Sequence, residues 1–73
     1  MRYYVIREIL ECEEIGKYKA YGIELREKGM VLRRVSDVFR TYKSAWRFCR
    51  RCNRFRLSPE HLDDAIEDAI AVE

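Results

Sequence analysis

Two glycine-containing turns divide the first half of this sequence into three short segments rich in β-branched and aromatic residues. The segments run from Tyr3 to Leu10, from Lys17 to Arg26 and from Met30 to Val35, and the turns contain Gly16 and Gly29. Such residues favour strands, and glycine readily supplies the positive φ that tight turns need. Because connections this short cannot carry a parallel crossover, the chain is expected to form a three-stranded antiparallel meander.

The first predicted strand is apolar on both faces, so we expect both faces to be at least partly covered. The second predicted strand contains Gly22 in its interior, where glycine usually marks a bulge or a close backbone approach. The two apolar faces of the first strand are Tyr3, Val5 and Ile9 on one side and Tyr4, Ile6 and Leu10 on the other.

Two helices are expected after the strands. The first runs from Tyr42 to Arg54 with Thr41 as its N-cap, and Asn53 near its end is a residue that tolerates the left-handed conformation. The second begins at Ser58-Pro59-Glu60, a serine cap followed by proline. The apolar stripes are Ala45, Phe48, Cys49, Cys52 and Phe55, flanked by Tyr42 and Trp46, on the first helix, and Leu62, Ala65, Ile66, Ala69 and Ile70 on the second. The expected fold is α+β, a β-β-β-α-α chain with both helices packed on one face of the sheet.

The length of 73 residues predicts a single domain over positions 1–73, with 48% apolar residues to build its core. A chain this short buries a modest core, so self-association or a partner is expected to add stability. No stretch is long and apolar enough for a membrane helix or a signal-peptide core, so no membrane association is expected. Three cysteines argue against a disulfide framework and favour a reducing, cytoplasmic location.

Charge is distributed unevenly along the chain although the net charge is only +2. Residues 26–56 carry a net charge of +9, and residues 57–73 carry −6. The basic residues of the first helix fall on the face opposite its apolar stripe, where a partner can bind them. We therefore expect a small protein-interaction or regulatory module, acting as a homodimer or on an acidic protein. A nucleic-acid-binding domain is the alternative, with aromatic stacking only if Tyr42 or Trp46 is exposed. The candidate partner-binding residues are Lys43, Arg47, Arg50, Arg51 and Arg54.

Sites for chemistry are sparse. Cys49 and Cys52 form a C-x-x-C pair, but in mid-helix on an apolar face they are expected to fill the core rather than act in redox chemistry. A zinc site would need these two cysteines together with His61 and Cys12, and the usual second ligand pair is missing. His61 has no evident nucleophile to serve, and the acids of the last helix lack the loop spacing of a calcium site. We expect no catalytic residues, no bound metal, no cofactor, no small-molecule substrate and no enzyme activity.

The segment Asn53-Arg54-Phe55-Arg56-Leu57-Ser58-Pro59-Glu60-His61-Leu62-Asp63-Asp64-Ala65-Ile66-Glu67-Asp68 resembles a C-terminal signature of a family of small bacterial, mostly clostridial, proteins of unknown function. That signature reads N-x-x-x-L-S-P-x-H-L-x-D-x-[IV]-E-D. Tyr21-Gly22-Ile23 and Val35-x-Asp37-Val38 are similar to the same pattern. The resemblance implies no activity, and the unbroken basic face of the first helix differs from the mixed charge of those proteins.

Overall fold

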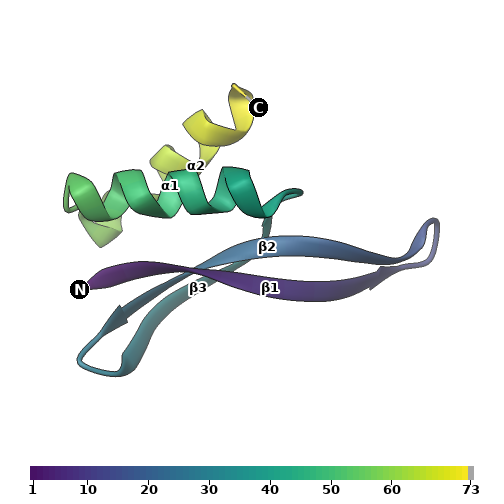
Figure 1. Ribbon diagram of the computed structural model, residues 1–73, viewed down its shortest axis with the longest axis horizontal. Coiled ribbons are helices and arrows are strands. Elements are labelled where there is room, and N and C mark those ends of the chain that lie inside the picture. Colours follow the sequence, from purple (N-terminus) through teal and green to yellow (C-terminus); the bar gives the residue numbers. More distant parts are fainter. Residues whose placement is uncertain (73) are drawn as a thin grey trace.

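The computed structural model describes residues 1–72 as three strands followed by helices (Figure 1). The elements are β1 (Arg2–Cys12), β2 (Gly16–Glu27), β3 (Met30–Phe39), α1 (Tyr42–Arg54), a 3₁₀ turn η1 (Pro59–His61) and α2 (Leu62–Ala71). The sheet is antiparallel in the order β1-β2-β3. The predicted β-β-β-α-α fold is therefore confirmed.

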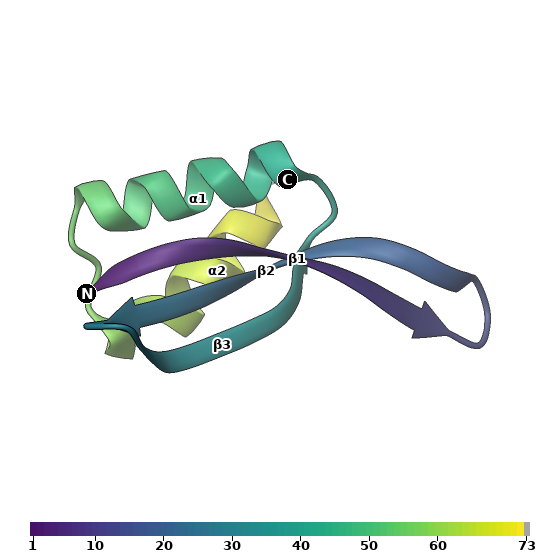
Figure 2. The same ribbon diagram turned by 60° about the horizontal axis from the view of Figure 1, so that its bottom comes forward.

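The core lies between one face of the sheet and the two helices (Figure 2). Ile23 and Leu25 at the centre of β2 are fully buried, and Tyr3 joins them from β1. Burial of these apolar side chains is the main favourable contribution to folding. The helices contribute Ala45, Phe48, Cys49, Cys52, Leu62 and Ile66. Two residues of the predicted stripes, Phe55 and Ile70, are instead exposed, since each lies at the end of its helix beyond the reach of the sheet.

The opposite face of the sheet carries no helix among the described residues, and β1 is only partly covered on that side, within the expectation that both of its faces are at least partly covered. Ile6 and Leu10 are half-buried, and Tyr4 is partly covered by the guanidinium of Arg26, which lies 4.4 Å from its ring centre. Side chains from the neighbouring strand thus provide part of the cover that a second layer of secondary structure would give this face.

β3 is longer than the predicted Met30–Val35 segment because it continues to Phe39 through an irregular stretch. The register shifts between Tyr21 and Ile23, opposite the positive φ of 55° at Asp37. A Cβ on Gly22 would lie 2.5 Å from the carbonyl oxygen of Val35. Gly22 therefore marks both a bulge and a close backbone approach, as its position in the sequence predicts.

The two helices begin differently. Thr41 caps α1 as predicted, because its hydroxyl oxygen accepts a hydrogen bond from the Ser44 amide at 3.2 Å. The predicted serine cap of the second helix is wrong: the Ser58 side chain makes no capping hydrogen bond. Instead the Ser58 carbonyl accepts from the His61 amide at 3.0 Å, which closes a 3₁₀ turn, and α2 starts only at Leu62.

Candidate functional site

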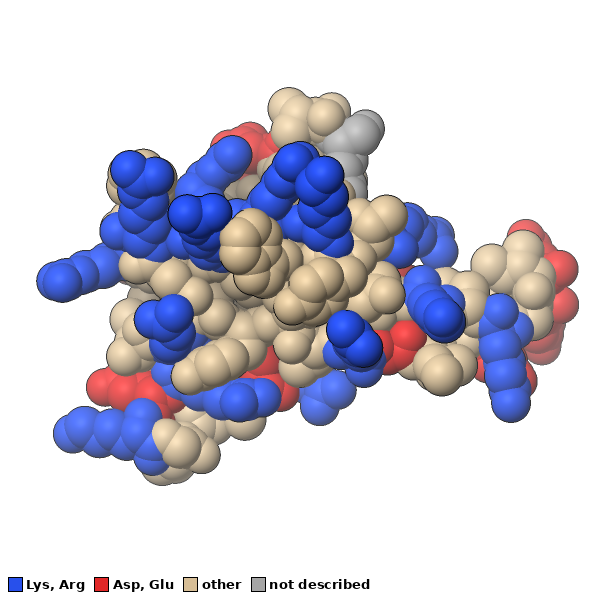
Figure 3. Space-filling model, in the orientation of Figure 1, with Lys and Arg blue, Asp and Glu red and all other residues tan. Residues whose placement is uncertain are grey.

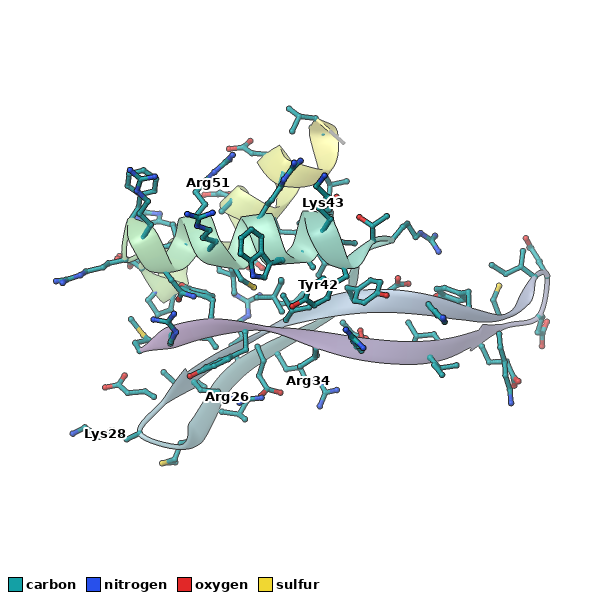
Figure 4. The ribbon with its side chains drawn as sticks, in the orientation of Figure 1. Arg26, Lys28, Arg34, Tyr42, Lys43 and Arg51 are labelled. Carbon is teal, nitrogen blue, oxygen red and sulfur yellow. The ribbon has the colours of Figure 1, made fainter. Side chains whose placement is uncertain are left out.

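The basic side chains of α1 lie on its outer surface, as helical periodicity predicts. Lys43 and Arg51 point away from the sheet in Figure 4, and Figure 3 shows lysines and arginines gathered over α1. No ion pair within residues 1–72 involves any of this set. Its positive charge is therefore not neutralised within the described chain and is available to a partner. The exposed residues are Lys43, Arg47, Arg50, Arg51 and Arg54.

A groove of about 1090 Å³ runs between α1 and β1, and we call it the α1–β1 groove. Two arginines enter it from the helix, Arg50 and Arg54, and two enter it from the strand, Arg2 and Arg7. Among residues 1–72, no carboxylate lines the groove. The rest of its lining is aromatic, apolar or amide: Tyr3, Tyr4, Val5, Tyr42, Trp46, Cys49 and Asn53. The groove thus combines positive charge with aromatic surface.

The aromatic residues at the start of α1 are more exposed than their place at the flank of the apolar stripe suggested. Tyr42 and Trp46 are 43% and 44% exposed. The Arg7 guanidinium lies 5.1 Å from the Tyr42 ring centre, and that of Arg50 lies 5.2 Å from the Trp46 ring centre. These distances are within the range of cation–π attraction. Tyr42 lies between the start of α1 and the sheet (Figure 4), so the arginines and rings form one continuous surface.

Asn53 ties the end of α1 to the outer edge of β1, the edge that β2 does not pair with. Its side-chain oxygen accepts from the Tyr3 amide at 2.7 Å, and its side-chain nitrogen donates to the Tyr3 carbonyl at 3.0 Å. Asn53, which tolerates the left-handed conformation, does not adopt it here. Arg56, with a φ of 50°, takes it instead. The side-chain amide of Asn53 thus makes the two hydrogen bonds that a neighbouring strand would make with the main chain of Tyr3. The rest of the edge has no such partner among the described residues.

The direction of the Tyr3 main-chain groups fixes that of its neighbours along β1. In an antiparallel pair, residues alternate between pointing both polar groups at the partner strand and pointing both away from it. The β1–β2 register runs without a shift from Arg2 to Cys12. The main-chain groups of Val5, Arg7, Ile9 and Glu11 therefore point outward like those of Tyr3. No other strand of the described chain pairs with this edge.

The cysteines of the C-x-x-C pair are buried against the core, as their position on the apolar stripe predicts. Burial raises the pKa of the Cys49 thiol to about 12, with a further contribution from neighbouring Cys52. Burial also raises the pKa of Cys52, to about 11. A buried neutral thiol is a poor nucleophile, because the thiolate is the reactive form.

Thiol labelling tests this packing. With an aromatic disulfide reagent at pH 8, we expect only Cys12, which is half-buried near the hairpin, to react quickly in the native protein. All three cysteines are expected to react in urea. Because the folded pKa values exceed the unfolded value of about 8.5, the two buried thiols stabilise the fold fully below that pH. That stabilisation is expected to be lost as the pH rises through 11 to 12. Three fast-reacting thiols in the native protein would contradict the buried arrangement.

The residues that a zinc site would need do not lie together. No three His, Cys, Asp or Glu side chains within residues 1–72 are grouped as a metal ion would require. Cys49 and Cys52 face the core, and His61 is exposed in η1. The His61 Nε2 lies 3.8 Å from a carboxylate oxygen of Glu60, its immediate neighbour. These residues therefore do not form one site.

Comparisons with family models, with curated proteins and with solved structures give no match to this chain. The clostridial resemblance accordingly stays a prediction. Within residues 1–72, no helix has the length and apolar character needed to cross a bilayer.

Proposed function

We propose that this protein is an interaction module that binds an acidic, extended polypeptide segment in the α1–β1 groove. The segment adds as a strand to the free edge of β1, while its carboxylates contact the arginines of the groove. The observation that carries the proposal is the combination, within residues 1–72, of a strand edge that is unpaired beyond Tyr3 with a groove that has four arginines and no carboxylate.

The strand edge favours a polypeptide as the ligand. The outward main-chain groups of Val5 and Arg7 recur at the spacing of a β-ladder, and only another polypeptide backbone matches that spacing. Strand addition of this kind obtains affinity from main-chain hydrogen bonds and specificity from alternate side chains. Alternate side chains of an added segment would point toward α1, where the arginines lie.

The charge of the groove favours an acidic segment. A guanidinium presents its donors in a planar fork that matches a carboxylate, and Arg2, Arg7, Arg50 and Arg54 surround the same groove. Exposed ion pairs contribute only about 0 to 1 kcal/mol each. The arginines are therefore expected to select acidic segments and to speed their association, while the strand edge and the aromatic rings hold the segment in place.

A peptide titration tests the proposal. Trp46 is the only tryptophan of the chain and lines the groove, so its fluorescence reports occupancy. We expect a ten-residue peptide of alternating glutamate and valine to change this fluorescence saturably, and the same peptide with lysine for glutamate to have no effect. Two further versions separate strand addition from charge attraction. In each, the amides that point to one edge of the extended peptide are N-methylated, which removes their hydrogen bonds. The version methylated on the edge that faces β1 is expected to fail, and the version methylated on the opposite edge is expected to bind.

Charge-reversed variants locate the binding site. We expect Arg50→Glu combined with Arg54→Glu to weaken the acidic peptide by roughly 10- to 100-fold, because two attractions become repulsions. The control is Lys17→Glu combined with Lys28→Glu, which changes the net charge equally at exposed positions outside the groove (Lys28 is labelled in Figure 4). Equal weakening by both pairs would contradict binding in the groove, as would equal binding of both N-methylated peptides.

A single-stranded nucleic acid is the second candidate, and the exposure of Tyr42 and Trp46 beside arginines favours it. Base stacking on such rings is tolerant of sequence, and phosphates pair with guanidinium groups. If a ten-nucleotide oligothymidylate contacts four arginines, its affinity falls roughly 50-fold between 50 and 200 mM salt. Oligonucleotide binding of this kind, lost in Trp46→Ala and unmatched by any acidic peptide, would overturn the first proposal in favour of this one.

A further inference from the structure

The outer edge of β1 has only one of the features that usually protect an exposed strand from pairing, namely charged side chains such as Arg7 and Glu11. Natural edge strands are otherwise shortened, bulged, or marked with proline and with charged residues, lysine above all. β1 pairs with β2 over its whole length without a register shift and contains neither proline nor lysine. Ile9 on this strand is 72% exposed, and within residues 1–72 Asn53 alone occupies the edge, at Tyr3.

The other edge of the sheet is protected. β3 carries two register irregularities against β2 and a left-handed residue, Asp37, in its interior. Arg33 on this strand forms an ion pair with Asp63 of α2, with 2.5 Å between the charged atoms. Of the two edges, β1 is therefore the one open to a strand partner.

We propose that this partner is β1 of a second copy of the same chain, added in antiparallel orientation with the two-fold axis at Ile9. The two three-stranded sheets then form one six-stranded sheet with the helices of both copies on the same side. This inference rests on the proposed function, because it names the acidic segment that enters the α1–β1 groove.

The sequence of the edge selects this register. With the axis at Ile9, Arg7 of each copy lies directly opposite Glu11 of the other, and the two Ile9 side chains face each other. With the axis moved two residues in either direction, Arg7 opposes Arg7 or Glu11 opposes Glu11. With the axis moved one residue, Glu8 opposes Glu8 or Ile9 opposes Glu11. Opposite charges in directly opposed positions stabilise antiparallel strands, and like charges destabilise them. The Ile9 register therefore both pairs the charges and covers the exposed isoleucine.

This register also determines where the tip of the β1–β2 hairpin of each copy lies relative to the other copy. With the axis at Ile9, the strand residues from Ile6 to Cys12 pair between the copies, and the turn that follows Cys12 of one copy lies next to Val5 of the other, beside the groove. Glu13 and Glu14 occupy the turn between β1 and β2 and are exposed. This acidic tip meets a groove whose charges, among the described residues, come from arginines, so each copy supplies the acidic segment that the other binds. Asn53 limits the pairing, because it already occupies the edge at Tyr3.

A charge swap tests the dimer in the full-length protein by sedimentation equilibrium. We expect the native protein to dimerise, and Arg7→Glu or Glu11→Arg alone to weaken dimerisation on the order of 100-fold, since each places like charges opposite each other at two related positions. The double variant Arg7→Glu/Glu11→Arg restores opposite charges and is expected to restore dimerisation. Failure of the double variant to exceed the single variants would overturn the register.

Disulfide trapping tests the position of the axis. Hydrogen-bonded antiparallel pairs have Cα atoms about 5.5 Å apart, within the span of a disulfide. In a Cys12→Ser background, Ile9→Cys is therefore expected to cross-link two copies under mild oxidation. Ile15→Cys, at a comparably exposed position, is the control and is expected to cross-link far less. Equal cross-linking at both positions would overturn the proposal.

The two proposals fail separately. A protein that stays monomeric at all concentrations but binds the alternating acidic peptide refutes the dimer and retains the groove as an acceptor of other acidic proteins. A protein that dimerises through Ile9 but shows no competition between dimerisation and the peptide contradicts the shared use of the groove. Loss of both dimerisation and peptide binding refutes both proposals.

Discussion

Replacing Gly22 with alanine is expected to destabilise the domain by about 3 kcal/mol, at the upper end of the usual cost of overpacking. The added methyl group would lie 2.5 Å from the carbonyl oxygen of Val35 and 3.0 Å from the Cδ1 of Ile6. The carbonyl belongs to the backbone of β3 and can move only if the strand moves. In a domain of this size the loss corresponds to a fall in melting temperature of roughly 15 °C, measurable by circular dichroism.

The same methyl group would displace a link between the two outer strands. Glu8 of β1 reaches over Gly22, and its carboxylate accepts from the Ser36 hydroxyl at 2.6 Å and from the Asp37 amide at 2.9 Å. A Cβ on Gly22 would lie 2.9 Å from the nearer of these carboxylate oxygens. The absence of a side chain at Gly22 thus makes room for the Glu8 carboxylate, through which β1 holds the irregular part of β3 in place.

Gly29→Ala is the matched control for this prediction. Gly29 has a φ of 79° but no atom within 4 Å of its would-be Cβ, so alanine there meets backbone strain without a clash. Its expected cost is about 1 to 2 kcal/mol, from the left-handed conformation alone. If Gly29→Ala destabilised the protein as much as Gly22→Ala, the close approach of Val35 would not be the reason for glycine at position 22.

The alternation of apolar residues and the two turn glycines were sufficient to predict the meander, because both signals are local. The end of β3 was not predictable in this way. Asp37 has the left-handed conformation in mid-strand, which breaks the alternation that the prediction depends on. It is held there by Glu8, a residue distant in sequence, and by the Tyr18 hydroxyl, which donates to the Asp37 carboxylate at 2.8 Å. Only the folded sheet brings these residues together.

Two of the four groove arginines were predictable, because their signal, like that of the meander, is local in the sequence. The helical spacing of the basic residues places Arg50 and Arg54 on the outer surface of α1 from sequence alone. Arg2 and Arg7 carry no such signal, because their role depends on α1 lying along β1. The pairing of Asn53 with Tyr3 joins residues 50 positions apart. No spacing rule reveals such a contact, so the groove and the free edge emerge only from the tertiary structure.

Glu24 supports the second large stability prediction, because its carboxylate is almost fully buried on the helix-free face of the sheet. The residue is 5% exposed, yet sequence analysis did not single it out. Arg26 forms an ion pair with it through Nε, and Arg34 approaches it with an Nη1 at 3.9 Å. Figure 4 shows both arginines on the sheet, on the side away from α1. A buried charge requires such partners, since its desolvation is otherwise uncompensated.

Replacing Arg26 and Arg34 together with methionine, which retains most of the apolar stem, is expected to cost about 2 to 3 kcal/mol in urea unfolding. This is below the usual penalty for breaking a buried pair, because water reaches Glu24 once the arginines are gone. Adding Glu24→Met to that variant removes the carboxylate that has lost its partners, and is expected to recover most of the lost stability. If the triple variant were as unstable as the double one, the arginines would stabilise the sheet through packing, and the charge of Glu24 would not be the cause.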